Sequence, residues 1–193
     1  MRKINSINNF NKNNKFKAEF KAEFRAVFRM VLWSLLFLFL FGLLINFLKF
    51  FGFGLSYQES QSMTPGWYVA YPIFGFSKIK RNEKLLFQPN KITEDLMLER
   101  GWIAPHAFLM KYAMGVPGDF ICIKKNYFWI NGQKIGKIFQ KDSLGRPLPK
   151  LKFCRVLEPK EYWMGSTRVM NSFDSRYFGV VNVNQIKSQV VKI

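Results

Sequence analysis

An uncharged apolar run at residues 31–48 constrains this chain more than any other feature. Together with the apolar residues 50–55, it reaches the ~20 residues that a helix needs to cross a bilayer. A cleaved signal peptide would have a shorter apolar core, of ~7–15 residues, followed by a small-x-small site. The stretch from Lys49 to Leu55 offers no such site. The run therefore predicts a retained transmembrane anchor over residues 31–54, with signal-peptide cleavage as the competing interpretation.

Charged residues are distributed unevenly around this run. The chain has 30 Lys and Arg against 12 Asp and Glu, and residues 1–30 contain eight basic and two acidic residues. Basic residues concentrate on the cytoplasmic side of membrane proteins, so we expect residues 1–30 in the cytoplasm and residues 56–193 outside it. The expected location is a bacterial inner membrane, with the larger segment in the periplasm. No nucleic-acid-binding motif is present, so a lipid bilayer is the expected anionic partner.

Phenylalanine recurs every four residues in the basic segment, at Phe16, Phe20, Phe24 and Phe28. On a helix of ~3.6 residues per turn these side chains share one face, and a basic residue follows each of them. Such a helix could place its phenylalanines in the membrane interface while its basic residues bind anionic headgroups. It could equally be a solvated extension of the anchor.

Residues 56–193 are numerous enough to bury a core of their own, and their pattern is mostly that of strands. Asn131-Gly132 between two apolar runs predicts a hairpin, because this pair tolerates the positive φ angles of a two-residue type I′ turn. A short helix is expected at 92–100. The expected strands are 67–71, 84–88, 107–111, 119–124, 127–130, 133–135, 177–181 and 189–193. We therefore predict a mainly β chain, with one N-terminal transmembrane helix followed by an antiparallel β domain.

The two cysteines of the chain, Cys122 and Cys154, both lie in this outer segment. An even number of cysteines outside the cytoplasm favours a disulfide, and two buried free thiols are the alternative. Two cysteines and the single histidine cannot fill a tetrahedral zinc shell without carboxylates. We expect neither a metal nor another cofactor.

Ser62 and Lys111 are the candidates for nucleophilic chemistry. A serine is a poor nucleophile until a base removes its proton. His106 lies five residues before Lys111, so within one strand it would point to the opposite face. Lysine can act as the base if desolvation among apolar neighbours lowers its pKa from about 10.4. Residue types alone leave a second interpretation open, in which Lys111 is an edge-strand charge that discourages aggregation.

Three segments, in order, resemble the motifs of one family. Ser60-Gln-Ser62-Met-Thr-Pro65 is similar to the nucleophile motif of the signal peptidase family of Ser-Lys endopeptidases. The segment from Lys111 to Asp119 is similar to its lysine motif, and the segment from Asn171 to Gly179 is similar to its Ser-x-Asp-Ser-Arg motif. The stretch Asp142-Ser-Leu-Gly-Arg-Pro-Leu-Pro149 resembles the TraF-type conjugative-transfer branch. The resemblance spans nearly the whole outer segment.

The resemblance implies a role for each matching residue. Ser62 would attack the scissile carbonyl, while Lys111 would take its proton and later give it to the leaving amine. The Ser62 backbone N–H and the Ser60 hydroxyl would form the oxyanion hole. Ser172 would donate or accept a hydrogen bond that orients Lys111.

The last motif also implies an ion pair between Asp174 and Arg176 that braces the site; an ordinary turn salt bridge is the alternative. Just upstream, general signal peptidases carry Gly-Asp-Asn-Arg, whereas this chain has Gly165-Ser-Thr-Arg168, one residue further from the motif. Pro65 is followed by Gly-Trp-Tyr, where general signal peptidases usually have Thr-Leu. These departures leave the Ser-Lys pair intact, and the Gly-x-Tyr form after Pro65 is similar to the TraF-type branch.

The expected function is that of a membrane-anchored serine endopeptidase that removes the signal or propeptide of a translocated prepilin or conjugation precursor. The branch resemblance implies small residues before the cut and circularisation of the product as a second activity. A general signal peptidase is one alternative. A non-catalytic membrane component of a secretion or conjugation channel is the other. The expected partners are a protein substrate and the lipid bilayer.

Overall fold

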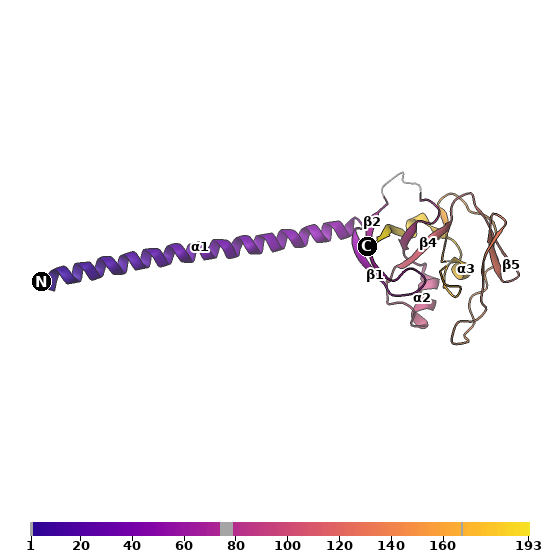
Figure 1. Ribbon diagram of the computed structural model, residues 1–193, viewed down its shortest axis with the longest axis horizontal. Helices are drawn as coiled ribbons and strands as arrows, with labels where there is room; N and C mark the ends of the chain where they lie inside the picture. The colour runs from indigo at the N-terminus through magenta and orange to yellow at the C-terminus, as the bar shows by residue number, and fades with distance from the viewer. Residues whose placement is uncertain (1, 74–78, 167) are drawn as a thin grey trace. The chain divides into compact units, whose positions relative to one another are not determined.

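The computed structural model describes residues 2–73, 79–166 and 168–193 (Figure 1). Side chains are described from Lys21 onward except for that of Ala22. The chain divides into two compact units, one ending at Lys49 and the other beginning at Phe50.

The first unit is a single unbroken helix, α1 (Arg2–Phe50). Its segment Glu23–Phe50 is long and apolar enough to cross a membrane, and its described side chains are almost all exposed. It therefore has the character of a membrane anchor or a signal sequence. Phe24 and Phe28 of the repeat are exposed on this helix, whereas the side chains of Phe16 and Phe20 lie outside the described part.

The helix ends four residues before the predicted end of the anchor. Gly52 follows it with a φ of 88°, a conformation that favours glycine, and the chain turns into strand β1 (Gly54–Gln58). Residues 54 and 55, which the apolar pattern assigns to the membrane span, therefore belong to the β domain.

The second unit is built on a seven-stranded antiparallel sheet with the order β1-β2-β11-β3-β4-β9-β10. The last strand of the chain, β11, inserts between β2 and β3, so the two ends of this unit are joined in one sheet. Besides β1, its strands are β2 (Gly66–Pro72), β3 (Lys84–Phe87), β4 (Leu109–Gly115), β9 (Glu161–Gly165), β10 (Val181–Asn182) and β11 (Ile186–Lys192).

A second, four-stranded antiparallel sheet has the order β7-β6-β5-β8. Its strands are β5 (Phe120–Lys124), β6 (Tyr127–Ile130), β7 (Gln133–Lys137) and β8 (Cys154–Val156). The predicted hairpin is confirmed: Asn131 and Gly132 take φ values of 49° and 81° between β6 and β7. Cys122 and Cys154 lie opposite each other on β5 and β8 and form a disulfide.

Helix α2 (Lys91–Glu99) lies where a helix is expected, and the Asn90 side chain caps it by accepting a hydrogen bond from the Thr93 N–H. The strand predicted at 177–181 is wrong. Helix α3 (Ser175–Phe178) takes the first two residues of that segment, because Asp174 caps its start and Gly179, with a φ of 82°, ends it. Of the segment, only Val181 lies in a strand, β10. A 3-10 turn (Val183–Gln185) then leads into β11.

Apolar side chains pack on both faces of the larger sheet. On β4, Leu109 and Ala113 belong to a cluster with Phe87 of β3, whereas Met110 belongs to a second cluster with Met63. Alternate residues of a strand point to opposite faces, so β4 is buried on both sides. A third cluster joins the two sheets and contains Met114, Ile121, Phe128, Ile130, Leu157 and Trp163. This central, doubly covered strand is the one that carries Lys111.

Candidate active site

Ser62 lies in the loop between β1 and β2, and contacts on its C-terminal side anchor it. The neighbouring Met63 side chain is fully buried, in a cluster with Met110. Two residues after Ser62, the Thr64 carbonyl accepts a hydrogen bond of 2.7 Å from the Tyr68 hydroxyl. The loop therefore holds the serine against the sheet, with only 7% of its surface exposed.

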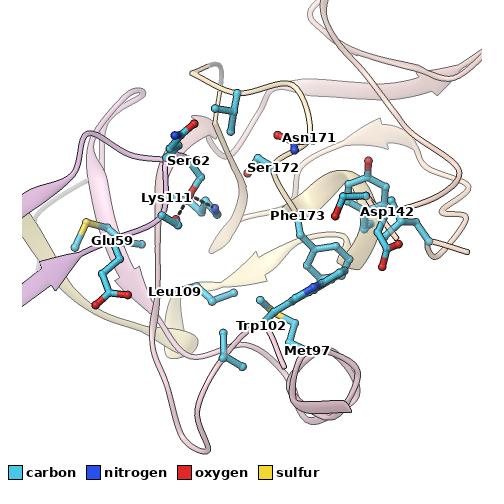
Figure 2. Close-up of a pocket in the computed structure, with 18 of the residues that line it drawn as sticks. Glu59, Ser62, Met97, Trp102, Leu109, Lys111, Asp142, Asn171, Ser172 and Phe173 are labelled. Atoms are coloured by element: carbon cyan, nitrogen blue, oxygen red, sulfur yellow. Dashed lines mark hydrogen bonds between the residues drawn. The ribbon is translucent and has the colours of Figure 1, made fainter. Parts of the chain in front are cut away.

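Lys111 reaches this serine from the centre of the sheet. It is the third residue of β4, which lies between β3 and β9. Its amine nitrogen, Nζ, donates a hydrogen bond of 2.7 Å to Ser62 Oγ, across 49 residues of sequence (Figure 2). Because β4 has a strand on each side and Lys111 is 7% exposed, the edge-strand interpretation of this lysine is excluded.

Burial lowers the pKa of Lys111, as a lysine needs if it is to act as a general base. Desolvation, the largest effect, disfavours the ammonium form and lowers the pKa of Lys111. The Asp174 carboxylate raises this pKa, and the Arg176 guanidinium lowers it further. The result is a pKa of Lys111 lowered from 10.5 to about 8. Roughly a tenth of the molecules then carry a neutral amine at pH 7, as opposed to about 0.03% for an unperturbed lysine.

Two groups close to Ser62 Oγ can donate hydrogen bonds: the Ser60 hydroxyl and the backbone N–H of Ser62. The Ser60 hydroxyl oxygen lies 2.9 Å from Ser62 Oγ, and the Gln58 amide donates to that hydroxyl at 2.6 Å. The backbone N–H of Ser62 donates no hydrogen bond to any other residue in the described part of the chain. Both the Ser60 hydroxyl and the Ser62 N–H are therefore available near the place where a substrate carbonyl would meet Ser62.

Asp174 and Arg176 form a buried, two-pronged ion pair. Arg176 donates to both Asp174 carboxylate oxygens, at 2.8 and 2.7 Å, and the two side chains are 2% and 1% exposed. The remaining donors of Arg176 bind the carbonyl oxygens of Lys137, Met170 and Ser172. This pair ties the segment before α3 to the smaller sheet, so it is not an ordinary surface salt bridge.

Ser172 lines the same cleft as Lys111 and is 4% exposed (Figure 2). Its hydroxyl makes no hydrogen bond within the described residues. The expected hydrogen bond between Ser172 and Lys111 is therefore not formed in this structure, and the orienting role of Ser172 stays a prediction.

His106 is not part of this arrangement. It precedes β4 with a φ of 58°, its imidazole is 87% exposed, and it is absent from the described lining of the cleft. The Glu94 Oε1 lies 3.8 Å from the His106 Nδ1.

Ser62 and Lys111 open onto a cleft of about 760 Å³. Figure 2 shows Asp142 across the cleft from Ser62, where Arg100 and Arg146 hold its carboxylate at 3.3 and 2.7 Å. The apolar part of the wall is formed by Met97, Trp102, Ile103, Phe108, Leu109 and Phe173, among others. The described residues contain no group of three or more His, Cys, Asp or Glu side chains that could hold a metal ion. A buried Ser-Lys pair at a cleft with an apolar part to its wall is suited to attack on the carbonyl of a bound peptide.

The family model for signal peptidase, peptidase S26, matches residues 28–193. The chain belongs to this peptidase family. Two proteins similar to it are both plasmid transfer proteins TraF from Escherichia coli. One is 26% identical over 128 residues, which cover 58% of this chain and 68% of the relative. The other is 31% identical over 103 residues, which cover 46% of this chain and 55% of the relative.

A crystal structure of a signal peptidase I from Enterococcus faecalis is also similar to this chain. It shares 16% sequence identity, covers 61% of this chain and 100% of its own, and has a TM-score of 0.37. Membership of the S26 family implies that the substrate is a protein.

In this S26 family member, one contact at the candidate site is not predicted from the sequence. The Ser166 hydroxyl donates a hydrogen bond to the carbonyl oxygen of Ser62. Ser166 lies in the Gly165-Ser-Thr-Arg168 stretch, which stands out in the sequence only as a departure from the general signal peptidase pattern. No local signal brings it to Ser62, because the two are 104 residues apart and meet only through the folded sheet.

Proposed function

We propose that this chain is a membrane-anchored serine endopeptidase in which Ser62 and Lys111 form the catalytic dyad. The substrate is a translocated prepilin or another conjugation precursor, from which the enzyme removes a signal or propeptide. The observation that carries the proposal is the 2.7 Å hydrogen bond between a buried lysine, with a pKa lowered to about 8, and a serine at the edge of a cleft.

Catalysis begins with the neutral form of Lys111. Its amine takes the proton of the Ser62 hydroxyl while Ser62 Oγ bonds to the scissile carbonyl carbon. The resulting ammonium returns the proton to the departing amine, and the carbon–nitrogen bond breaks to leave an ester on Ser62. A water molecule then attacks this ester while Lys111 takes one of its protons. Collapse releases the new carboxylate and restores the Ser62 hydroxyl.

The oxyanion formed in each attack is stabilised by the Ser62 N–H and the Ser60 hydroxyl. The Ser60 proton is directed at Ser62 Oγ or at an incoming oxyanion, because the Gln58 amide donates to the Ser60 oxygen. Loss of one such donor typically costs about 2.7–4 kcal/mol of transition-state stabilisation. Ser172 orients Lys111 through a hydrogen bond that forms during turnover, and the Asp174–Arg176 pair braces the wall behind it.

The membrane location is supported by two features. Helix α1 supplies an apolar segment of sufficient length, so its residues 31–50 are proposed as the anchor, 1–30 as its cytoplasmic extension and the β domain that begins with β1 as the periplasmic peptidase domain. Within the β domain, the exposed Leu55, Val69 and Val191 pair across β1, β2 and β11, and the exposed Tyr57 and Trp67 pair in the next row. Such an apolar face is suited to the bilayer surface.

The names of the two relatives support a substrate that belongs to plasmid transfer. Circularisation would follow if the amino terminus of the product, in place of water, attacked the ester on Ser62. In that step the amine nitrogen bonds to the ester carbon while Lys111 takes the proton that the amine loses. Lys111 then passes this proton to the departing Ser62 Oγ, which releases a cyclic peptide and restores the Ser62 hydroxyl.

The test uses the full-length protein in detergent with a prepilin substrate, comparing wild type with Ser62→Ala and Lys111→Met. Both variants should lose cleavage by at least about 10³-fold. Ser143→Ala is a matched control, because Ser143 lines the same cleft and makes no hydrogen bond to Ser62 or Lys111 within the described residues. Equal cleavage by wild type and Ser62→Ala would refute the assignment of Ser62 and Lys111 as the catalytic dyad. An inert wild type that still assembles with a secretion channel would favour the non-catalytic alternative.

A panel of precursors distinguishes the substrate classes. Similar kcat/KM values for prepilins and for ordinary secreted precursors would indicate a general signal peptidase. Mass spectrometry of the product separates hydrolysis from circularisation, since a cyclic product is lighter than the linear one by one water molecule.

A further inference from the structure

A buried serine outside the expected motifs holds the main chain of the nucleophile. Ser166 directly follows β9 and is 4% exposed. Its hydroxyl donates a hydrogen bond to the carbonyl oxygen of Ser62. The residue Ser62 is itself 7% exposed. This contact joins the end of a core strand to the loop between β1 and β2.

The direction of the Ser166 hydroxyl is determined by its partners. A carbonyl oxygen only accepts, so the Ser166 proton points at Ser62. The Ser166 oxygen accepts in turn from the Arg168 N–H at 3.1 Å. The Ser166 N–H donates to Asp174 Oδ2 at 3.3 Å, and Arg176 holds both oxygens of that carboxylate. A buried hydrogen-bond network therefore runs from the ion pair to the main chain of the nucleophile.

We propose that Ser166 is a positioning residue that sets the backbone conformation of Ser62 and so keeps its Oγ in reach of Lys111. The inference rests on the proposed function. Ser62 lies outside the strands, so no ladder of backbone hydrogen bonds holds it. Ser166 binds the carbonyl oxygen of Ser62, whereas the Ser62 N–H donates no hydrogen bond within the described residues and is available to the oxyanion. An error of ~1 Å in the placement of a reacting group can cost about 10²-fold in rate.

The role requires a neutral hydrogen-bond donor at residue 166. In the general signal peptidase pattern an aspartate stands near this place, and an ionised carboxylate can only accept. Such a group would repel both the Ser62 carbonyl and the Asp174 carboxylate. The serine in this chain is therefore matched to a contact that the aspartate could not make.

The experiment measures kcat, KM and the pH profile of the full-length protein on the same prepilin substrate. Ser166→Ala should lower kcat about 10–100-fold, with little change in KM and the same midpoint pH, because the surroundings of Lys111 are kept. Ser166→Thr should restore most of the rate. A cavity of about 50 Å³, lined by Ser166 and Gly136, has room for the extra methyl group.

Ser188→Ala is the matched control. Ser188 is also a buried serine, and its hydroxyl donates a hydrogen bond of 2.8 Å to the backbone carbonyl of Gly52. Neither Ser188 nor Gly52 is among the described residues that line the cleft. This variant should lose stability while retaining kcat. If Ser166→Ala does not accumulate, Ser166→Cys replaces it, since a thiol is a weaker donor at the same position and should give an intermediate kcat.

A wild-type kcat in Ser166→Ala, or in Ser166→Cys where that variant is used, overturns the inference. So does a fall in kcat that Ser166→Thr does not rescue, or one that Ser188→Ala reproduces. Cleavage that persists in Ser62→Ala refutes the dyad instead, so the two proposals fail by different results.

Discussion

The neutral amine of Lys111 is the base in the proposed mechanism, so kcat should follow the neutral fraction of that lysine. The structure lowers its pKa from 10.5 to about 8, chiefly through burial. A change of 2.5 pKa units corresponds to about 3 kcal/mol and raises the neutral fraction at pH 7 about 300-fold. Catalysis at neutral pH by this dyad depends on that change.

The value of kcat should therefore rise with pH. Below about pH 8, log kcat should increase with a slope near one, and above about pH 9 it should be flat. The rate at pH 7 should be about a tenth of the plateau. The assay is kcat at saturating prepilin substrate between about pH 5.5 and 10, with circular dichroism at each pH to show that the protein stays folded.

Two outcomes would refute this reasoning. A midpoint near pH 6.5 would identify an imidazole as the base, and a rate that still rises beyond about pH 10 would mean an unperturbed lysine. His106→Gln is the matched control, since that imidazole is exposed and is not among the described residues lining the cleft. Its profile should coincide with that of the wild type.

Two predictions concern stability. Between about pH 8 and 10.5 the unfolded chain binds a proton at Lys111 that the folded chain has lost, so the free energy of unfolding of the wild type should rise relative to Lys111→Met by about 3 kcal/mol. A difference that stays constant in chemical denaturation across that range would contradict this. Replacing Cys122 and Cys154 together by serine opens a loop with a sequence separation of 32 and should cost about 3–4 kcal/mol. Because neither cysteine is among the described cleft-lining residues, kcat should be retained; an unchanged Tm would be the contrary result.

Several parts of the fold follow from local signals. The hairpin at Asn131-Gly132 and the helix capped by Asn90 need only neighbouring residues, and both lie where the sequence predicts them. Helix α3 was missed because its apolar segment is short and β-prone, while its start depends on the Asp174 cap and its end on Gly179. Strand β1 was missed because its first residues continue the apolar character of the anchor.

The sequence by itself determined the apolar helix, the β-rich domain after it, and the order of motifs that singles out Ser62 and Lys111. Only the tertiary structure decided that these two side chains touch, because the strand order of the sheet brings together residues that are 49 positions apart. The tertiary structure also decided the protonation state of Lys111. A pKa near 8 results from burial on a central strand and from the charges of Asp174 and Arg176, which the chain supplies from a distant segment. The contact between Ser166 and Ser62 has the same origin: its hydrogen-bonding groups are common ones, and only folding makes them neighbours.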